Sequence, residues 1–79
     1  MHPEETVVKR LLAEVCAIDV ASIRNDAPLI EYGLDSARAI DLLVGLEAEL
    51  NIRISDADAA RMRTVNDLVV YVRAAKGAK

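Results

Sequence analysis

The chain has 79 residues, a formal net charge of −3 at pH 7 and 53% apolar residues. This length predicts a single small domain over residues 1–79, which would bury only about 60–65% of the surface of the unfolded chain. The apolar content favours a folded chain over a disordered one. The negative net charge argues against a nucleic-acid-binding protein, because such proteins are normally basic.

The sequence also lacks the signals of membrane and secreted proteins. It contains no apolar run of 18 residues, and Met1 to Glu5 lack the basic and apolar segments of a signal peptide. We therefore expect a cytoplasmic protein without membrane insertion. One cysteine, Cys16, and one histidine, His2, are too few ligands for a Cys/His metal site. Cys16 lies among apolar residues, where a buried and unreactive thiol is expected.

A first helix is expected from about residue 4 to residue 17. Apolar residues recur there at helical spacing: Val7, Val8, Leu11, Leu12 and Val15. Pro3 and the two glutamates that follow it suit a helix start, because proline is tolerated in the first turn and acids complement the helix dipole.

A long loop is expected next, from about residue 19 to residue 32. It is longer than a usual structureless connection, so a short helical turn within it is expected. Ile23, Leu29 and Ile30 are the apolar residues that should anchor this loop to the core.

A second helix is expected over residues 36–50, with Asp35 as its N-cap. On a helical wheel its apolar side carries Ala39, Leu42, Leu43, Leu46 and Leu50. Arg38, Gly45 and Glu49 are placed on the opposite side. A glycine inside a helix costs about 1 kcal/mol relative to alanine, so we expect a neighbouring element to approach closely at Gly45.

Two further helices complete the predicted fold. A short one is expected at about residues 56–61, capped by Ser55 or Asp56, and a longer one at about residues 65–75. Thr64 and Asp67 form a variant capping box before the last helix, whose buried stripe should be Val65, Leu68, Val69 and Val72. Because no sustained strand-like alternation occurs, the sequence predicts an all-α bundle of three main helices and one short helix, with the long loop between the first two.

The segment Gly33-Leu34-Asp35-Ser36 places a hydroxyl where the loop becomes the second helix. A helix N-terminus offers unpaired N–H groups and a partial positive charge, so it suits a phosphate on Ser36. A hydrolase nucleophile is excluded, because no strand precedes Ser36 and the only histidine is His2. From the Asp-Ser pair alone, a simple helix-capping serine is favoured over a modified one.

The wider sequence reverses that preference. The segments that carry a family resemblance cover most of the chain: Asp26 to Leu29, Tyr32 to Ser36, Leu46 to Leu50, Ile52 to Asp56 and Thr64 to Leu68. In this order and at this spacing, the chain resembles the acyl carrier protein family, which includes the related thiolation domains. The serine motif alone is moderately specific, whereas its place in a helical domain of this size is strongly so.

The resemblance implies that Ser36 carries 4′-phosphopantetheine, transferred from coenzyme A by a phosphopantetheinyl transferase that uses Mg²⁺. The thiol of this arm would hold an acyl group as a thioester. The chain would then be a carrier and no enzyme, presenting its cargo to a ligase, an acyltransferase or a ketosynthase. Asp35 would flank the phosphodiester and contribute to the encounter with the transferase.

The second helix is expected to be the docking face for these enzymes. Its candidate docking residues form an apolar strip edged by acids: Ala37, Ile40, Asp41, Val44 and Glu47. Ile40 and Val44 are equally consistent with a wider core. Docking should be weak and partly electrostatic, since a tethered substrate has a high effective concentration at the docked enzyme.

The sequence departs from the family at several positions. Many carriers have leucine or methionine after the serine, where this chain has Ala37, and Arg38, Arg61 and Arg63 add positive charge. These departures indicate a specialised carrier in a lipid, polyketide or secondary-metabolite pathway. We expect it to be free-standing, because the sequence begins at Met1 and ends a few residues after the last predicted helix, and monomeric, because nothing in the sequence indicates an oligomer. Two alternatives stay open: an aminoacyl, peptidyl or aryl carrier loaded by an adenylating ligase, and a helical interaction module that is never modified.

Overall fold

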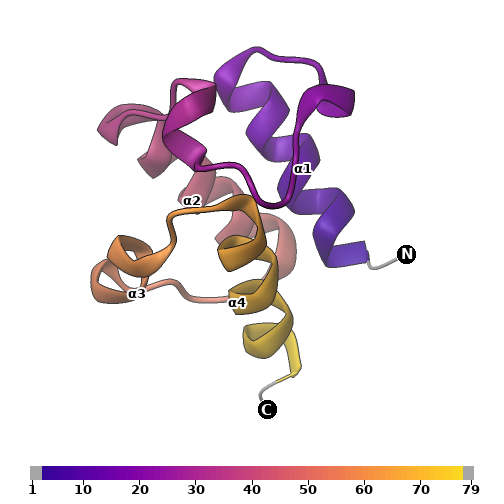
Figure 1. Cartoon of the computed structure of the whole chain (residues 1–79). Helices are drawn as coiled ribbons and strands as arrows, with labels where there is room; N and C mark the ends of the chain where they lie inside the picture. The colour runs from indigo at the N-terminus through magenta and orange to yellow at the C-terminus, as the bar shows by residue number, and fades with distance from the viewer. Residues whose placement is uncertain (1–2, 78–79) are drawn as a thin grey trace.

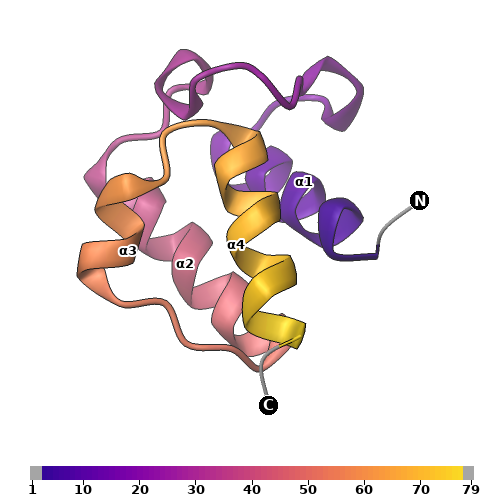
Figure 2. The same ribbon diagram turned by 60° about the horizontal axis from the view of Figure 1, so that its bottom comes forward.

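The structure is a computed structural model that describes residues 3–77. Within this range the chain forms four α-helices, α1 (Pro3–Cys16), α2 (Ser36–Leu50), α3 (Asp56–Arg61) and α4 (Val65–Gly77). Two 3₁₀ helices, η1 (Val20–Ser22) and η2 (Leu29–Tyr32), lie in the loop between α1 and α2. The predicted all-α bundle is confirmed (Figures 1 and 2).

The helix boundaries lie close to those expected from the sequence. Helix α1 begins and ends one residue earlier than predicted, and α4 continues two residues further, to Gly77. The ends of the predicted domain 1–79, including His2, lie outside the described residues.

The core is aliphatic and is built from all three long helices. Each long helix contributes fully buried residues to it. Helix α1 contributes Val8 and Leu12, and α2 contributes Leu42 and Leu46. Helix α4 contributes Val65, Leu68, Val69 and Val72. The remaining apolar residues predicted for α1 pack against this cluster while partly buried: Val7, Leu11 and Val15. The periodicity of the sequence therefore identified the faces that meet.

The long loop is held to the core, but by two of its three predicted anchors. Ile23 and Leu29 are each 6% exposed, whereas Ile30 is 78% exposed, so the prediction for Ile30 is wrong. Residues follow each other at about 120° around a 3₁₀ helix, so the turn of η2 that directs Leu29 inward directs Ile30 outward. The expected helical turn in this loop is confirmed, and it occurs twice.

This loop also runs antiparallel to the link between α3 and α4 (Figure 1). The N–H of Leu29 donates to the carbonyl oxygen of Arg63 at 2.8 Å, and the N–H of Asn66 donates to that of Asn25 at 2.8 Å. The loop that precedes Ser36 is thereby fixed to the α3–α4 link and to the start of α4.

Helix α1 covers a side of α2 that the helical wheel placed away from the core. A β-carbon built on Gly45 would lie 3.4 Å from Cδ2 of Leu11, and Glu49 forms an ion pair with Arg10 of α1. The expected close approach at Gly45 is therefore confirmed, and Gly45 faces α1 instead of solvent. Glu49 is exposed, in agreement with its placement away from the core. The wheel assumed one buried direction, whereas α1 packs beside the leucine stripe of α2.

The capping box of α4 is present and reciprocal. The N–H of Asp67 donates to Oγ1 of Thr64 at 3.1 Å, and the N–H of Thr64 donates to Oδ2 of Asp67 at 3.2 Å. The same carboxylate oxygen accepts from the N–H of Arg63 at 3.0 Å. The backbone N–H groups of Arg63 and Thr64 lower the pKa of Asp67 below its usual value.

We expect Asp67→Asn to reduce the free energy of unfolding at pH 7 by about 1 kcal/mol, the usual value of a capping interaction. Because folding lowers the pKa of Asp67, its contribution is present above the pKa of the unfolded chain and is lost as the pH falls through the folded value. The difference between the variant and the wild type should therefore shrink on acidification from neutral pH to about pH 3.

Urea unfolding followed by helical circular dichroism at both pH values measures this difference. Asp56→Asn, which removes the same charge from the exposed first residue of α3, is the matched control. A variant that loses the same stability at both pH values would contradict the role assigned to the Asp67 charge.

Candidate functional site

The approach to Ser36 is shaped by two residues before α2. Gly33 ends η2 with φ +80°, in the left-handed region that glycine adopts readily. Asp35 is the N-cap of α2, and its Oδ1 accepts from the N–H of Arg38 at 2.9 Å. Ser36 is the first residue of the helix and is exposed.

This geometry bears on why a serine stands at position 36. The predicted cap at Asp35 is confirmed, and the capping hydrogen bond is made by that residue. A hydroxyl on Ser36 is therefore not required to cap α2. Ser36 is an exposed residue at the positive end of a helix of 15 residues.

Arg38 has a place at this site that the sequence did not reveal. Its Nη1 donates to the carbonyl oxygen of Gly33 at 3.1 Å, while its backbone N–H donates to Asp35. Arg38 therefore ties both sides of the turn that leads into Ser36 and adds a positive charge there. A helix N-terminus and a guanidinium are groups that favour an anion, so the residues present fit a phosphodiester on Ser36.

The candidate docking residues lie along α2, and four of the five are exposed: Ala37, Ile40, Asp41 and Val44. Ile40 and Val44 are 61% and 58% exposed, one helical turn apart. They do not widen the core, so that alternative is wrong. They form an uncovered apolar strip that begins one turn after Ser36.

Glu47, the fifth candidate, is differently placed. It is half-buried, and its Oε2 accepts from the N–H of Ile54 at 2.9 Å. This hydrogen bond holds the connection between α2 and α3. No sequence pattern predicts it, because Ile54 lies outside α2, in the connection to α3. Any change at Glu47 would disturb this connection as well as the surface charge.

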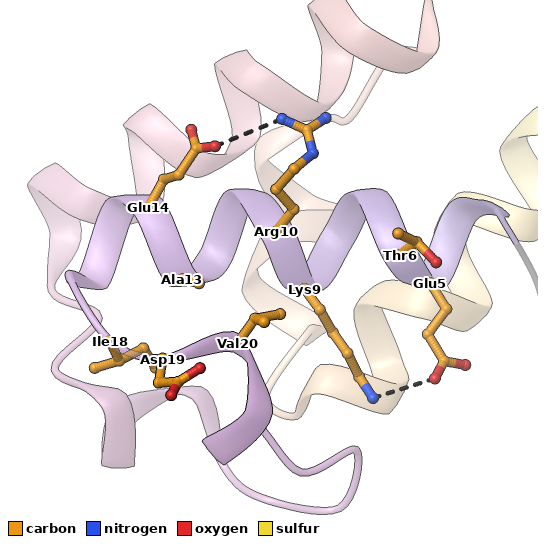
Figure 3. A pocket seen from close by; sticks show the side chains of 9 residues that line it. All are labelled: Glu5, Thr6, Lys9, Arg10, Ala13, Glu14, Ile18, Asp19 and Val20. Carbon is orange, nitrogen blue, oxygen red and sulfur yellow. Dashed lines mark ion pairs between the residues drawn. The ribbon is translucent and has the colours of Figure 1, made fainter.

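A large hollow lies elsewhere, between α1 and η1 (Figure 3). It measures about 740 Å³, and its charged lining residues are largely paired, Lys9 with Glu5 at 3.2 Å and Arg10 with Glu14 at 3.5 Å. None of the candidate site residues on α2 lines it. Its size is therefore no reason to place the functional site there.

The other sequence-based candidates give no competing site. Cys16 is half-buried, and burial raises the pKa of its thiol, which makes it a weaker nucleophile near neutral pH. The described residues hold no group of three or more His, Cys, Asp or Glu side chains arranged for a metal ion. No helix within residues 3–77 has the length and apolar character needed to cross a membrane.

Known proteins share both the sequence and the fold. Residues 6–72 match the family model described as "Phosphopantetheine attachment site". The chain is 33% identical over 66 residues to an acyl carrier protein of Thermotoga maritima, covering 82% of each chain. It is 35% identical over 71 residues to an acyl carrier protein of Desulforapulum autotrophicum, covering 87% of this chain and 92% of the relative.

The structural comparison agrees with the sequence comparisons. The crystal structure of an acyl carrier protein from Thermotoga maritima superposes with a TM-score of 0.78 at 27% identity, covering 94% of this chain and 92% of that one. The family match spans α2 and the turn before it, where an exposed serine follows a capping aspartate. The chain therefore belongs to the acyl carrier protein family, whose prosthetic group is 4′-phosphopantetheine.

Proposed function

We propose that Ser36 is the attachment residue for 4′-phosphopantetheine and that the chain carries acyl groups as thioesters on this arm. The observation that carries the proposal is that Ser36, the first residue of α2, is exposed and does not cap the helix. The capping hydrogen bond is made by Asp35. When bound, the group supplies a terminal thiol that forms the thioester. The chain supplies the attachment oxygen and a recognition surface, and the acyl-transfer chemistry belongs to its partner enzymes.

The residues around Ser36 have separate roles in this proposal. The first N–H groups of α2 and the guanidinium of Arg38 favour the negative charge of the phosphodiester. Asp35 holds the start of the helix by accepting from the N–H of Arg38, and Ser36, the first residue of the helix, is exposed. Its carboxylate also presents a negative charge to the transferase.

The test of this function uses intact-mass spectrometry. The purified chain is incubated with coenzyme A, Mg²⁺ and a broad-specificity phosphopantetheinyl transferase. We expect the mass to rise by one phosphopantetheinyl group and the new thiol to accept an acyl group from a suitable ligase or acyltransferase. No gain in mass with several such transferases would favour the alternative of an unmodified interaction module.

The docking face in this proposal is the exposed strip of α2, namely Ala37, Ile40, Asp41 and Val44. An apolar strip edged by an acid suits a partner that presents an apolar patch beside a basic side chain. Charge at such a rim steers the encounter more than it fixes the affinity. Glu47 contributes charge near this strip while its hydrogen bond to Ile54 keeps the adjoining connection in place.

Charge reversal at Asp41 tests the strip. We expect Asp41→Lys to lower kcat/KM of the transferase about fivefold, which corresponds to about 1 kcal/mol for an exposed charge pair, and to leave the helical circular dichroism unchanged. Glu14→Lys makes the same change of charge on α1, in the hollow of Figure 3, and should leave the kinetics unaltered. Wild-type kinetics for Asp41→Lys would remove this acid from the docking face.

The pathway is a finer part of the proposal. Exposed positive charge lies on α2 at Arg38, at the end of α3 at Arg61, and in the α3–α4 link at Arg63. Ala37 offers partners a smaller apolar contact than leucine or methionine would. We infer a carrier dedicated to particular partners in a specialised lipid, polyketide or secondary-metabolite pathway. A ketosynthase gene beside the gene for this chain would support this assignment, whereas an adenylation enzyme there would indicate aminoacyl or aryl cargo.

A further inference from the structure

The basic side chains of this protein differ in whether an acid of the same chain pairs with them. Those that form ion pairs are Lys9, Arg10, Arg24 and Arg73. Within residues 3–77, the exposed basic residues that form no ion pair are Arg38, Arg53, Arg61, Arg63 and Lys76. Two of this second group, Arg38 and Arg63, lie close to the turn that leads into Ser36.

Each of these two arginines has an aspartate near it in sequence, but backbone groups occupy that aspartate. Oδ1 of Asp35 accepts from the backbone N–H of Arg38 at 2.9 Å, and Oδ2 of Asp67 accepts from the backbone N–H of Arg63 at 3.0 Å. Both carboxylates cap helices and form no ion pair with the guanidinium groups. The two positive charges are therefore available to an acid from another molecule.

An apolar groove adjoins both arginines. Ile30, Leu34 and Met62 line it together with Arg63, and Ile30 is 78% exposed. Leu34 follows Gly33, whose carbonyl oxygen accepts from Nη1 of Arg38 at 3.1 Å. We call this surface the arginine face, and it consists of Arg38, Arg63, Ile30, Leu34 and Met62.

Ser36 therefore lies close to two apolar surfaces whose edges differ in charge. The docking strip of α2 carries the acid Asp41, whereas the arginine face carries two positive charges. Glu31, the acid next to Ile30 in sequence, lines a separate hollow with Arg24 and Tyr32. The charge at the edge of the arginine face is therefore positive.

We propose that the phosphopantetheinyl transferase of this carrier covers both surfaces, with carboxylates opposite Arg38 and Arg63 and a basic side chain opposite Asp41. The inference rests on the proposed attachment at Ser36. An enzyme that acts on Ser36 must approach the turn between the two surfaces. An enzyme whose docking surface is basic throughout would meet the arginine face as a like charge, which disfavours a wrong partner.

Two features make the arginine face suited to choosing a partner. The guanidinium of Arg38 is already held by the Gly33 carbonyl, so less side-chain freedom is lost when an acid binds it. Opposite charges on the two surfaces also fix the orientation of a docked enzyme, because a rotated approach would bring like charges together. The exposed Ile30 adds apolar area that a docked enzyme can cover.

Kinetics of phosphopantetheinylation test the inference. The probe is the phosphopantetheinyl transferase encoded in the same genome that modifies the wild-type chain with the highest kcat/KM. We expect Arg38→Gln and Arg63→Gln each to lower kcat/KM about threefold through KM, the size of an exposed charge pair. Glutamine still has an N–H donor for the Gly33 carbonyl. The loss should disappear in about 0.5 M sodium chloride, which screens exposed charges.

Arg53→Gln is the matched control. Arg53 is also exposed and forms no ion pair with residues 3–77, but it follows the far end of α2. This helix has 15 residues, which corresponds to a length of about 22 Å. The kinetics of Arg53→Gln should equal those of the wild type.

Chemical cross-linking identifies the acids directly. In Arg63→Lys the new amine can be joined to a carboxylate of the bound transferase by a carbodiimide, which forms an amide. Peptide mass spectrometry should find the link between position 63 and an Asp or Glu of the transferase. Arg53→Lys should give no link at position 53.

Two kinetic results would overturn the arginine face and leave the carrier function intact, since the wild type would still gain the phosphopantetheinyl mass. One is wild-type or faster kinetics for both Arg38→Gln and Arg63→Gln. The other is an equal loss in Arg53→Gln, which would reflect net charge alone. A wild-type chain that gains no mass with any transferase of its genome would overturn both proposals.

Discussion

The Ser36→Ala variant is expected to gain no mass when it is incubated with coenzyme A and a transferase that modifies the wild type completely. The substitution removes the only oxygen that the proposal makes available for the phosphodiester. It should leave the fold intact, because the cap of α2 is the carboxylate of Asp35 and alanine is the best helix former. Intact-mass spectrometry and helical circular dichroism together separate loss of attachment from loss of folding.

The matched control is another serine at a helix start. Ser55 is exposed and is the N-cap of α3, where its Oγ accepts from the N–H of Asp58 at 3.1 Å. Ser55→Ala should reduce stability by about 1 kcal/mol, as the loss of an N-cap usually does, and should still gain the full phosphopantetheinyl mass. A mass gain that persists in Ser36→Ala and disappears in Ser55→Ala would move the attachment to α3.

Local features of the fold were predictable because their causes lie within a few residues. The caps at Asp35 and Ser55 each depend on one side chain and an N–H group three residues on. The Thr64–Asp67 box depends on two side chains that are three residues apart. Helical periodicity likewise identified the buried faces, since residues three and four apart share one side of a helix. The choice of Ser36 as the site residue was different, because the Asp-Ser pair alone favours a capping serine and only the resemblance over most of the chain indicates a modified one.

Features that depend on which elements meet were not predictable in the same way. The exposure of Ile30 follows from the path of η2 along the link that contains Arg63. The contact of Gly45 with Leu11 follows from the position of α1. The hydrogen bond from the N–H of Ile54 to Glu47 joins the α2–α3 connection to α2. The spacing of residues in a single sequence does not predict contacts between residues that lie far apart along the chain.

Arg38 shows how this limit affects the site itself. The sequence marked it as a departure in charge from related carriers, and the structure shows its Nη1 donating to the carbonyl oxygen of Gly33. The turn before Ser36 is therefore stabilised by a side chain that follows the serine. A substitution at position 38 would change both the charge near the phosphodiester and the shape of this turn.

The second large effect is expected in the core beneath the docking strip. Leu46 of α2 is fully buried in the cluster that joins α2 to α1 and α4. Leu46→Ala should lower the free energy of unfolding by about 3 kcal/mol, from the lost apolar burial and the cavity left behind. A domain of 79 residues has a total stability of about 4–12 kcal/mol at ~0.05–0.15 kcal/mol per residue. Urea unfolding should measure this loss of free energy, and thermal melting should show a fall of about 12–24 °C in Tm.

Val44→Ala on the same helix is the matched control, because it truncates an apolar side chain that is exposed instead of buried. Val44 is 58% exposed, so its truncation should change the stability by less than about 0.5 kcal/mol. Because the cavity at Leu46 loosens the packing of α2, we expect Leu46→Ala to slow phosphopantetheinylation only at temperatures where the variant begins to unfold. A Leu46→Ala variant as stable as Val44→Ala would contradict the placement of α2, and with it the geometry on which the direction of Ser36 depends.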